Sequence, residues 1–217
     1  MLKKIKFKNS TLILFGIVII LLGVVVGLYE YFEERKNKTF SDMNIVLYDN
    51  EMPQNIQTKE EQTNNENEQI IDNKSENNND IINYIGLLEI PKINLKRGFY
   101  GLDSKYNSVD YNVTVINGST FPNEKNNNLI LAAHSGDCSI CYFNDLYKLK
   151  LDDIAYISYN NTKYKYKIVD IYEVEKDGTV EIYRDYSKSV LTLITCTRNS
   201  YTKQTVYILE NIDWKRW

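Results

Sequence analysis

The hydrophobic and polar positions divide the chain into three parts with different patterns. Residues 11–29 form an apolar run of nineteen residues without a charge. At about 1.5 Å per residue, a helix of this length spans about 28 Å, close to the hydrocarbon core of a bilayer. We therefore expect a transmembrane signal-anchor helix over residues 11–29. A cleaved signal peptide is disfavoured because no small-residue cleavage site follows the run. A buried core helix is disfavoured because a helix that is apolar on all sides would need protein around its whole surface.

Residues 30–83 are mostly polar. Between residues 51 and 80 there are eight Asn and six Glu but no aromatic residue. Such a composition buries too little apolar area to offset the entropy of ordering the chain. We therefore favour an extracytoplasmic spacer over residues 30–83 that is largely disordered. The hydrophobic residues scattered over residues 30–50 allow an alternative, a short helix just outside the membrane.

The remaining body, residues 84–217, consists of short apolar runs separated by turn signals, which is typical of β-strands. Asn160-Asn161 predicts a hairpin turn between two of them, and a short helix is expected near residues 142–148. Many short strands without long helices predict a mostly β fold that closes into a barrel. The expected strands cover residues 85–90, 128–133, 154–159, 163–174, 190–195 and 205–210.

The formal net charge of −3 is spread unevenly over the 217 residues. Residues 1–10 carry four Lys and no acid, residues 30–83 carry an excess of eight acidic groups, and the body is nearly neutral. No part has the excess of Lys and Arg that phosphate binding needs, which argues against a nucleic-acid partner. By the positive-inside rule, residues 1–10 form a cytoplasmic basic tip. The body then lies outside the cell membrane, held by a single pass through the bilayer at residues 11–29.

Two reactive side chains stand where expected strands open into loops. His134, the only histidine in the chain, follows the apolar run 129–133, and Cys196 ends the run 191–195. A cysteine nucleophile needs a base or a cation to hold it as thiolate, and histidine is the usual partner. From these two residues alone, a catalytic pair and an inert buried thiol beside a satisfied histidine are equally good interpretations.

The sequence around these two residues resembles the sortases, the Gram-positive cysteine transpeptidases. Thr192-Leu193-Ile194-Thr195-Cys196 is similar to the strand that carries the sortase cysteine, and Leu131-Ala132-Ala133-His134 resembles the strand end with the histidine, although Ala133 stands where the family usually has Gly. The segments at residues 85–93, 118–122 and 142–146 are similar to further sortase motifs in the same order. The resemblance covers residues 84–217 and implies a closed eight-stranded sortase-like β-barrel with short helices.

The resemblance implies a membrane-anchored enzyme that cleaves a C-terminal sorting signal, typically Leu-Pro-x-Thr-Gly-like, in secreted proteins. Cys196 would form a thioester, and His134 would protonate the leaving amine and later take a proton from the incoming one. The acceptor would be an amine of a cell-wall precursor or of a pilin Lys. The family needs no metal for this chemistry. Some members bind calcium in a loop, but the sequence has no cluster of Asp and Glu that predicts such a site.

The third catalytic residue of the family is an Arg at the start of the strand after the cysteine loop. At the matching positions this chain has Gln204 or Thr205, with Lys203 adjacent. We favour Arg198 for the oxyanion role, because strand alternation would place it on the same face as the Cys196 thiol. Lys203 and Gln204 are the alternative donors. The missing Arg also motivates a second hypothesis, a catalytically impaired sortase-like module that binds sorting signals without turnover.

Cys138 and Cys141 form a Cys-x-x-Cys pair just beyond His134. We favour two ordinary thiols lining a loop over a disulfide, which an extracytoplasmic location permits, and over a metal site with His134.

The resemblance indicates the sortase subclass less specifically than the family. The short segment after residue 174, the chain end soon after the last expected strand and the lack of an Asp-Pro-type lid resemble class A or D sortases more than pilin-polymerising ones.

Overall fold

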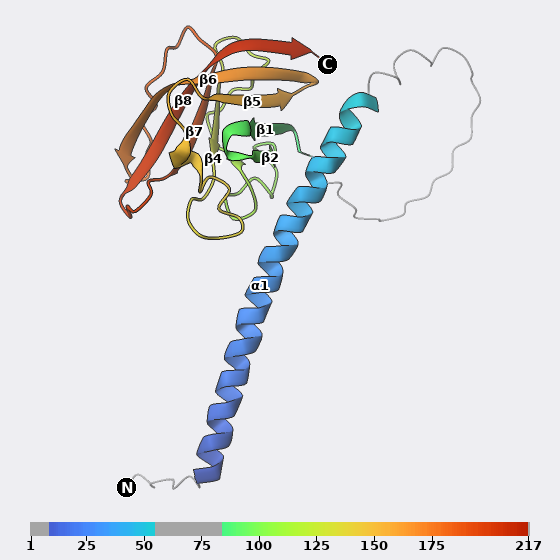
Figure 1. Ribbon diagram of the computed structural model, residues 1–217, viewed down its shortest axis with the longest axis vertical. Helices are drawn as coiled ribbons and strands as arrows, with labels where there is room; N and C mark the ends of the chain where they lie inside the picture. Colours follow the sequence, from blue (N-terminus) through green and yellow to red (C-terminus); the bar gives the residue numbers. More distant parts are fainter. Residues whose placement is uncertain (1–8, 55–83, 217) are drawn as a thin grey trace, which may run out of the picture.

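The computed structural model describes residues 9–54 and 84–216. A single long helix, α1 (Asn9–Gln54), runs alongside and beyond a body built from β-strands (Figure 1). Residues 1–8 of the expected basic tip at residues 1–10, and residues 55–83 of the expected spacer, lie outside the described residues, so the expectations for them stay predictions.

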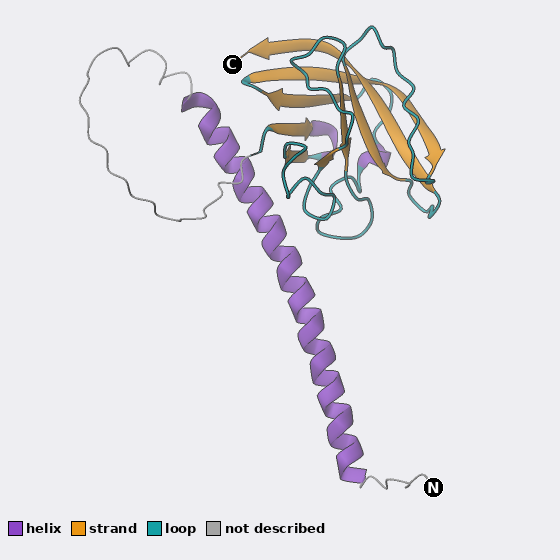
Figure 2. Cartoon of the chain, turned by 180° about the vertical axis from the view of Figure 1, so that it is seen from behind, coloured by secondary structure: helices purple, strands orange, loops and turns teal. Residues whose placement is uncertain are grey.

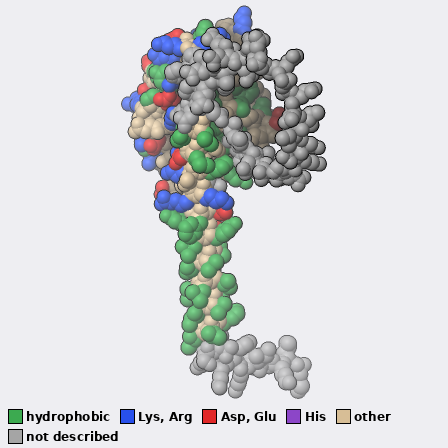
Figure 3. All heavy atoms as spheres, turned by 90° about the vertical axis from the view of Figure 1, so that its right-hand side faces the viewer, with side chains coloured by type: hydrophobic (Ala, Val, Ile, Leu, Met, Phe, Trp, Pro, Cys, Tyr) green, Lys and Arg blue, Asp and Glu red, His purple; other side chains and the backbone are tan. Residues whose placement is uncertain are grey.

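The first half of α1 has the surface of a membrane-spanning helix. Every large hydrophobic side chain from Ile13 to Leu28 is exposed, so no protein element covers any side of this part. In Figure 3 this part of α1 is covered by hydrophobic side chains, and charged ones begin nearer the body. In the described part of the chain, α1 is the one helix that is long and apolar enough to cross a membrane. An apolar helix surface of this length is typical of a membrane-spanning segment, and the anchor at residues 11–29 stays a prediction.

The second half of α1 continues through residues 30–54, where the composition favours a flexible stalk. The reason is tertiary contact: residues 41, 44, 45 and 48 share one helix face and lie against the body. Ile45 packs with Tyr84 and Tyr100, the Ser41 and Tyr84 hydroxyls are 2.9 Å apart, and the Asn44 amide donates to the Tyr100 hydroxyl at 3.1 Å. Burial against this face raises the pKa of Tyr84.

The body contains eight strands and two short 3-10 turns (Figure 2). The turns are η1 (Pro91–Ile93) and η2 (Leu146–Lys148), so most of the helix expected at residues 142–148 is loop. The strands are β1 (Gly86–Ile90), β2 (Leu95–Phe99), β3 (Thr114–Val115), β4 (Asn128–Ala132), β5 (Ile154–Tyr159), β6 (Thr162–Glu175), β7 (Val190–Cys196) and β8 (Lys203–Arg216).

These strands form one sheet in the order β2-β1-β5-β6-β8-β7-β4-β3. All neighbours are antiparallel except β4 and β7, which run parallel. An isolated bridge between Phe99, at the end of β2, and Val113, just before β3, links the two edges and nearly closes the barrel. The structure thus confirms the predicted mostly β fold, the eight-stranded barrel and the Asn160-Asn161 hairpin turn, in which both residues have positive φ.

Alternation along the strands separates two apolar clusters. Leu129, Leu131, Leu191 and Leu193 face the barrel interior with the main core. Their neighbours along the same strands point outward, where Ile130 and Ile194 pack under the segment between β6 and β7. A side chain that follows Ile194 by two positions therefore lies on this outer face.

Candidate active site

The parallel pairing of β4 and β7 brings His134 and Cys196 to the same place. Along this pair each residue of β4 lies opposite the residue 62 positions later, from Asn128 with Val190 to Ala132 with Ile194. His134 and Cys196 are separated by the same 62 positions. The two residues therefore stand side by side at matching points, two positions beyond the last paired residues.

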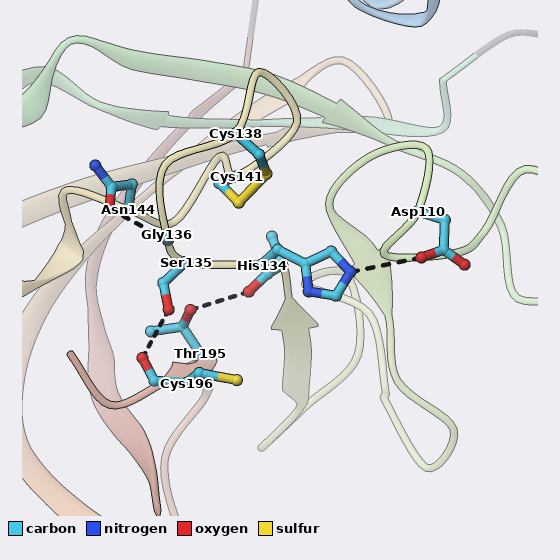
Figure 4. The surroundings of a disulfide bond; sticks show 10 residues. Asp110, His134, Ser135, Gly136, Cys138, Cys141, Asn144, Thr195 and Cys196 are labelled. Atoms are coloured by element: carbon cyan, nitrogen blue, oxygen red, sulfur yellow. Dashed lines mark hydrogen bonds and ion pairs between the residues drawn. A yellow bond between two sulfur atoms is a disulfide. The ribbon is translucent and has the colours of Figure 1, made fainter. Parts of the chain in front are cut away.

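Two side-chain hydrogen bonds fasten these strand ends together. The buried Thr195 hydroxyl donates to the Ala133 carbonyl oxygen at 3.0 Å, and the Ser135 hydroxyl donates to the Cys196 carbonyl oxygen at 2.8 Å (Figure 4). One bond lies just before and the other just after His134. The backbone on both sides of the imidazole is thus tied to the strand that carries the thiol.

The imidazole of His134 is partly exposed and is directed toward a carboxylate. Its Nε2 atom lies 3.5 Å from Oδ1 of Asp110, which belongs to the long segment between β2 and β3 (Figure 4). The Asp110 side chain is 76% exposed, so water screens this pair strongly. The His134 carbonyl oxygen accepts from the backbone N–H of Phe143, which holds the following loop against the strand end.

The thiol of Cys196 opens into a cavity of about 880 Å³ at this end of the barrel. Cys196 is half-buried, and its Sγ lies 3.7 Å from the ammonium Nζ of Lys176. Lys176, Arg198 and Tyr147 also line the cavity, while on the side of β4 the wall is formed by Ser135 rather than by His134. The cavity therefore offers a sulfur nucleophile, two cations and the edge of the histidine loop.

Of the three residues considered as oxyanion donors, Arg198 is the one that lines the cavity. Its guanidinium lies over the Tyr147 ring, 4.1 Å from the ring centroid. Lys203 and Gln204 are not among the cavity's lining residues. The Lys203 ammonium donates to Glu173 at 3.3 Å, and Gln204 pairs with Cys196 across the β7–β8 ladder.

Two titratable neighbours of the cavity have shifted pKa values. Burial raises the pKa of Tyr207 to about 12, so this cavity-lining phenol is neutral at physiological pH. A hydrogen bond from the Lys148 ammonium to Asp145 raises the pKa of Lys148, which keeps it cationic beside Tyr147 and Arg198.

Cys138 and Cys141 form a disulfide, so our preference for two ordinary thiols is wrong. Their Cα atoms are 5.1 Å apart, within the usual range for a disulfide, and an extracytoplasmic environment favours oxidation. The bond also removes the thiolates that a metal site with His134 would need. Within residues 9–54 and 84–216, no group of three or more His, Cys, Asp or Glu side chains could hold a metal ion.

Sequence reasoning missed two residues of this site. Lys176 precedes Cys196 by twenty positions and follows a strand rich in Lys and Tyr, so no local motif distinguishes it. Asp110 lies in a segment without regular structure, and only the folded chain brings it to His134. Both are loop residues whose position depends on tertiary structure rather than on periodicity.

A β-barrel with a cysteine and a histidine at adjacent strand ends defines a thiol-enzyme scaffold. The family model of the sortase domain matches residues 88–210, more than half of the chain. The chain therefore belongs to the sortase family, whose members are cysteine transpeptidases, and the predicted resemblance is confirmed. A comparison with curated protein sequences finds no match.

Solved sortase structures are similar to this chain over the barrel. Sortase C-1 from Actinomyces oris is 25% identical with a TM-score of 0.53, covering 60% of this chain and 72% of that one. Sortase C1 from Streptococcus agalactiae is 29% identical with a TM-score of 0.53, covering 60% and 68%. Sortase A from Listeria monocytogenes, 18% identical, shares the fold with a TM-score of 0.52, covering 62% and 90%. The TM-scores to sortases of the two classes are nearly equal, so our preference for class A or D stays a prediction.

Proposed function

We propose that this protein is a membrane-anchored transpeptidase that cleaves a Leu-Pro-x-Thr-Gly-like sorting signal through a Cys196 thioester. The observation that carries the proposal is the shared 62-residue offset of the β4–β7 register and of the pair His134 and Cys196. The only imidazole of the chain and its only free thiol occupy neighbouring strand ends in a barrel of the sortase family.

In the first step the Cys196 thiolate attacks the carbonyl carbon of the scissile peptide bond. The S–C bond forms, the carbonyl π electrons move to oxygen, and the C–N bond breaks when the tetrahedral intermediate collapses. His134, as imidazolium, donates the proton that the departing amine needs. Histidine suits this role because its charge changes near neutral pH.

In the second step an amine of a cell-wall precursor or of a pilin Lys attacks the thioester. His134, now neutral, takes a proton from the incoming amine, and Cys196 leaves as thiolate. The thioester keeps acyl-transfer reactivity, so an amine positioned in the cavity competes with water.

We assign the oxyanion donor role to Arg198. Its guanidinium lines the same cavity as the thiol, and its position over Tyr147 holds it at the cavity wall. A fixed cation near a developing oxyanion stabilises the transition state more than the ground state. In family members an Arg on the strand after the cysteine loop would supply this charge. In this chain Arg198, two positions after the end of β7, takes its place.

The anchor and charge pattern give the proposal its topology. Residues 11–29 cross the membrane with the basic tip in the cytoplasm, and the barrel works on the outer face. Sorting-signal proteins that are still held in the membrane after export would then meet the cavity near the bilayer.

The full-length chain in detergent is the form to test, because α1 packs on Tyr84 and Tyr100 and a barrel cut at residue 84 would expose that face. The protein is incubated with a panel of sorting-signal peptides and an amine such as triglycine, and products are separated by chromatography. We expect a transpeptidation product that Cys196→Ala and His134→Ala abolish. Stable binding of a peptide without any product would instead support the catalytically impaired module, which the missing β8 Arg motivates.

A further inference from the structure

The catalytic thiol has a cation beside it that comes from another strand. The Lys176 ammonium lies 3.7 Å from the Cys196 sulfur, within hydrogen-bonding distance for sulfur. The two residues are twenty positions apart in sequence. The contact is therefore a product of the fold and not of the local sequence around the cysteine.

The backbone around Lys176 is anchored to the strand next to the cysteine strand. Lys176 directly follows β6, and its N–H donates to the Thr202 carbonyl oxygen at 2.6 Å, extending the β6–β8 ladder by one bond. On the other side of β8, the Thr197 N–H donates to the Lys203 carbonyl oxygen at 3.0 Å. These bonds fix β8 between the two residues, so the long Lys176 side chain reaches across β8 to the thiol.

The neighbouring cations have other partners. The Lys203 ammonium, on β8 itself, is engaged by Glu173, and the Arg198 guanidinium lies over the Tyr147 ring. Lys176 is the cation that contacts the reacting sulfur atom directly.

We propose that Lys176 is a catalytic residue that holds the Cys196 thiolate. It supplies a positive charge at the sulfur, while Arg198 serves the oxyanion. The ammonium keeps its proton throughout. It stabilises the negative charge on sulfur before attack and again when the thiolate leaves the thioester. This inference rests on the proposed function for its catalytic meaning, but the contact with the thiol can be tested without a substrate.

An exposed ion pair has a measurable signature. Lys176 is exposed, so the attraction is near its value in water at this separation, and dissolved salt screens it. A purely structural role of Lys176 would show no dependence on charge or on salt. A lysine that holds the thiolate makes the thiol more reactive at low salt than at high salt.

The experiment measures alkylation of Cys196 by iodoacetamide near neutral pH in the full-length chain, followed by intact mass. Cys196 is the only target because Cys138 and Cys141 are joined. Lys176→Met is expected to slow alkylation about five-fold at low salt, the effect of losing one charge at this distance in water. Lys176→Arg should stay within about two-fold of wild type because it keeps the charge. Salt at about 0.5 M should narrow the gap between wild type and Lys176→Met.

Lys167→Met is the matched control, because Lys167 is a half-buried lysine of β6 whose ammonium pairs with Asp152 at 3.0 Å, and its loss should leave alkylation unchanged. Equal alkylation of wild type and Lys176→Met at low salt would overturn the inference, as would an equal loss in Lys176→Arg. A parallel assay with sorting-signal peptides separates the two proposals. Alkylation that depends on Lys176 without any peptide product would refute the proposed transpeptidation and leave the thiolate contact standing.

Discussion

His134 and Cys196 stand at matching positions at the ends of the paired strands β4 and β7, whereas the cations of the cavity, Lys176 and Arg198, stand just beyond β6 and β7. The strand-borne pair is placed by a ladder register and by two side-chain bonds that join the strand ends. The cations are exposed and reach the cavity through long side chains. The difference indicates that strand pairing fixes the nucleophile and the proton carrier, while the position of the cavity's positive charges depends on long, exposed side chains.

The largest effect that bears on this comparison is expected for His134→Ala. Removing a positioned general acid should lower the rate of thioester formation about 10²–10⁴-fold. The rate is measured with the best peptide of the panel by rapid quench and mass spectrometry. Retention of activity within about ten-fold of wild type would show that the strand-borne imidazole is not the proton carrier.

Arg198→Ala should lower the rate of thioester formation by as much as His134→Ala or by less. The loss of one oxyanion donor is expected to lower the rate about 10²–10³-fold. Lys203→Ala and Gln204→Ala are the comparators, and each should lower the rate less than Arg198→Ala, because neither residue lines the cavity. An unchanged rate in Arg198→Ala, or a larger loss in either comparator, would move the oxyanion role from the loop to β8.

Thr195→Val tests whether the hydrogen bond between the ends of β4 and β7 contributes to activity as well as to stability. The substitution removes the donor to the buried Ala133 carbonyl oxygen and should cost about 1–3 kcal/mol of unfolding free energy. Thr192→Val is the matched control, because Thr192 lies on the same strand and bonds the buried Asn128 of β4 at the far end. Thermal unfolding should shift by a similar amount in both variants, but only Thr195→Val should lower activity, by about ten-fold, since small misplacements at a site are costly.

The smallest effect is expected for Asp110→Asn. The carboxylate and the His134 imidazole form an exposed pair at 3.5 Å, and such pairs contribute little in water. The rate should fall by less than about three-fold, and added salt should remove the difference. If the loss exceeded ten-fold, a loop residue would be needed to orient the imidazole, and strand placement alone would not explain the site.

The sequence could predict the parts of the fold that follow from periodicity. Six of the strands, the Asn160-Asn161 turn and the apolar helix all have local signals. Two strands have none: β2 holds Lys96, Arg97 and Gly98 within five residues, and β3 has only two residues. Gly98 has a tertiary reason, because any side chain there would collide with the Tyr84 ring that packs on β2.

The same division applies to the site and to α1. His134 and Cys196 end apolar runs and lie in recognisable motifs, so both could be found from the sequence. Lys176 could not, because its place depends on the β6–β8 register. In α1, the spacing of residues 41, 44, 45 and 48 does predict a helix face, but composition alone gives no sign that a surface rich in tyrosine covers it.

The central claim, that this barrel forms a thioester at Cys196, is tested most directly by trapping that thioester. The full-length protein is mixed with the peptide panel without an amine, quenched in acid, digested and sequenced by tandem mass spectrometry. The account predicts a mass increase equal to the N-terminal part of one peptide, located on Cys196, absent in Cys196→Ala and released by added amine. A wild-type protein whose Cys196 is readily alkylated but never acquires this mass with any peptide would contradict the claim.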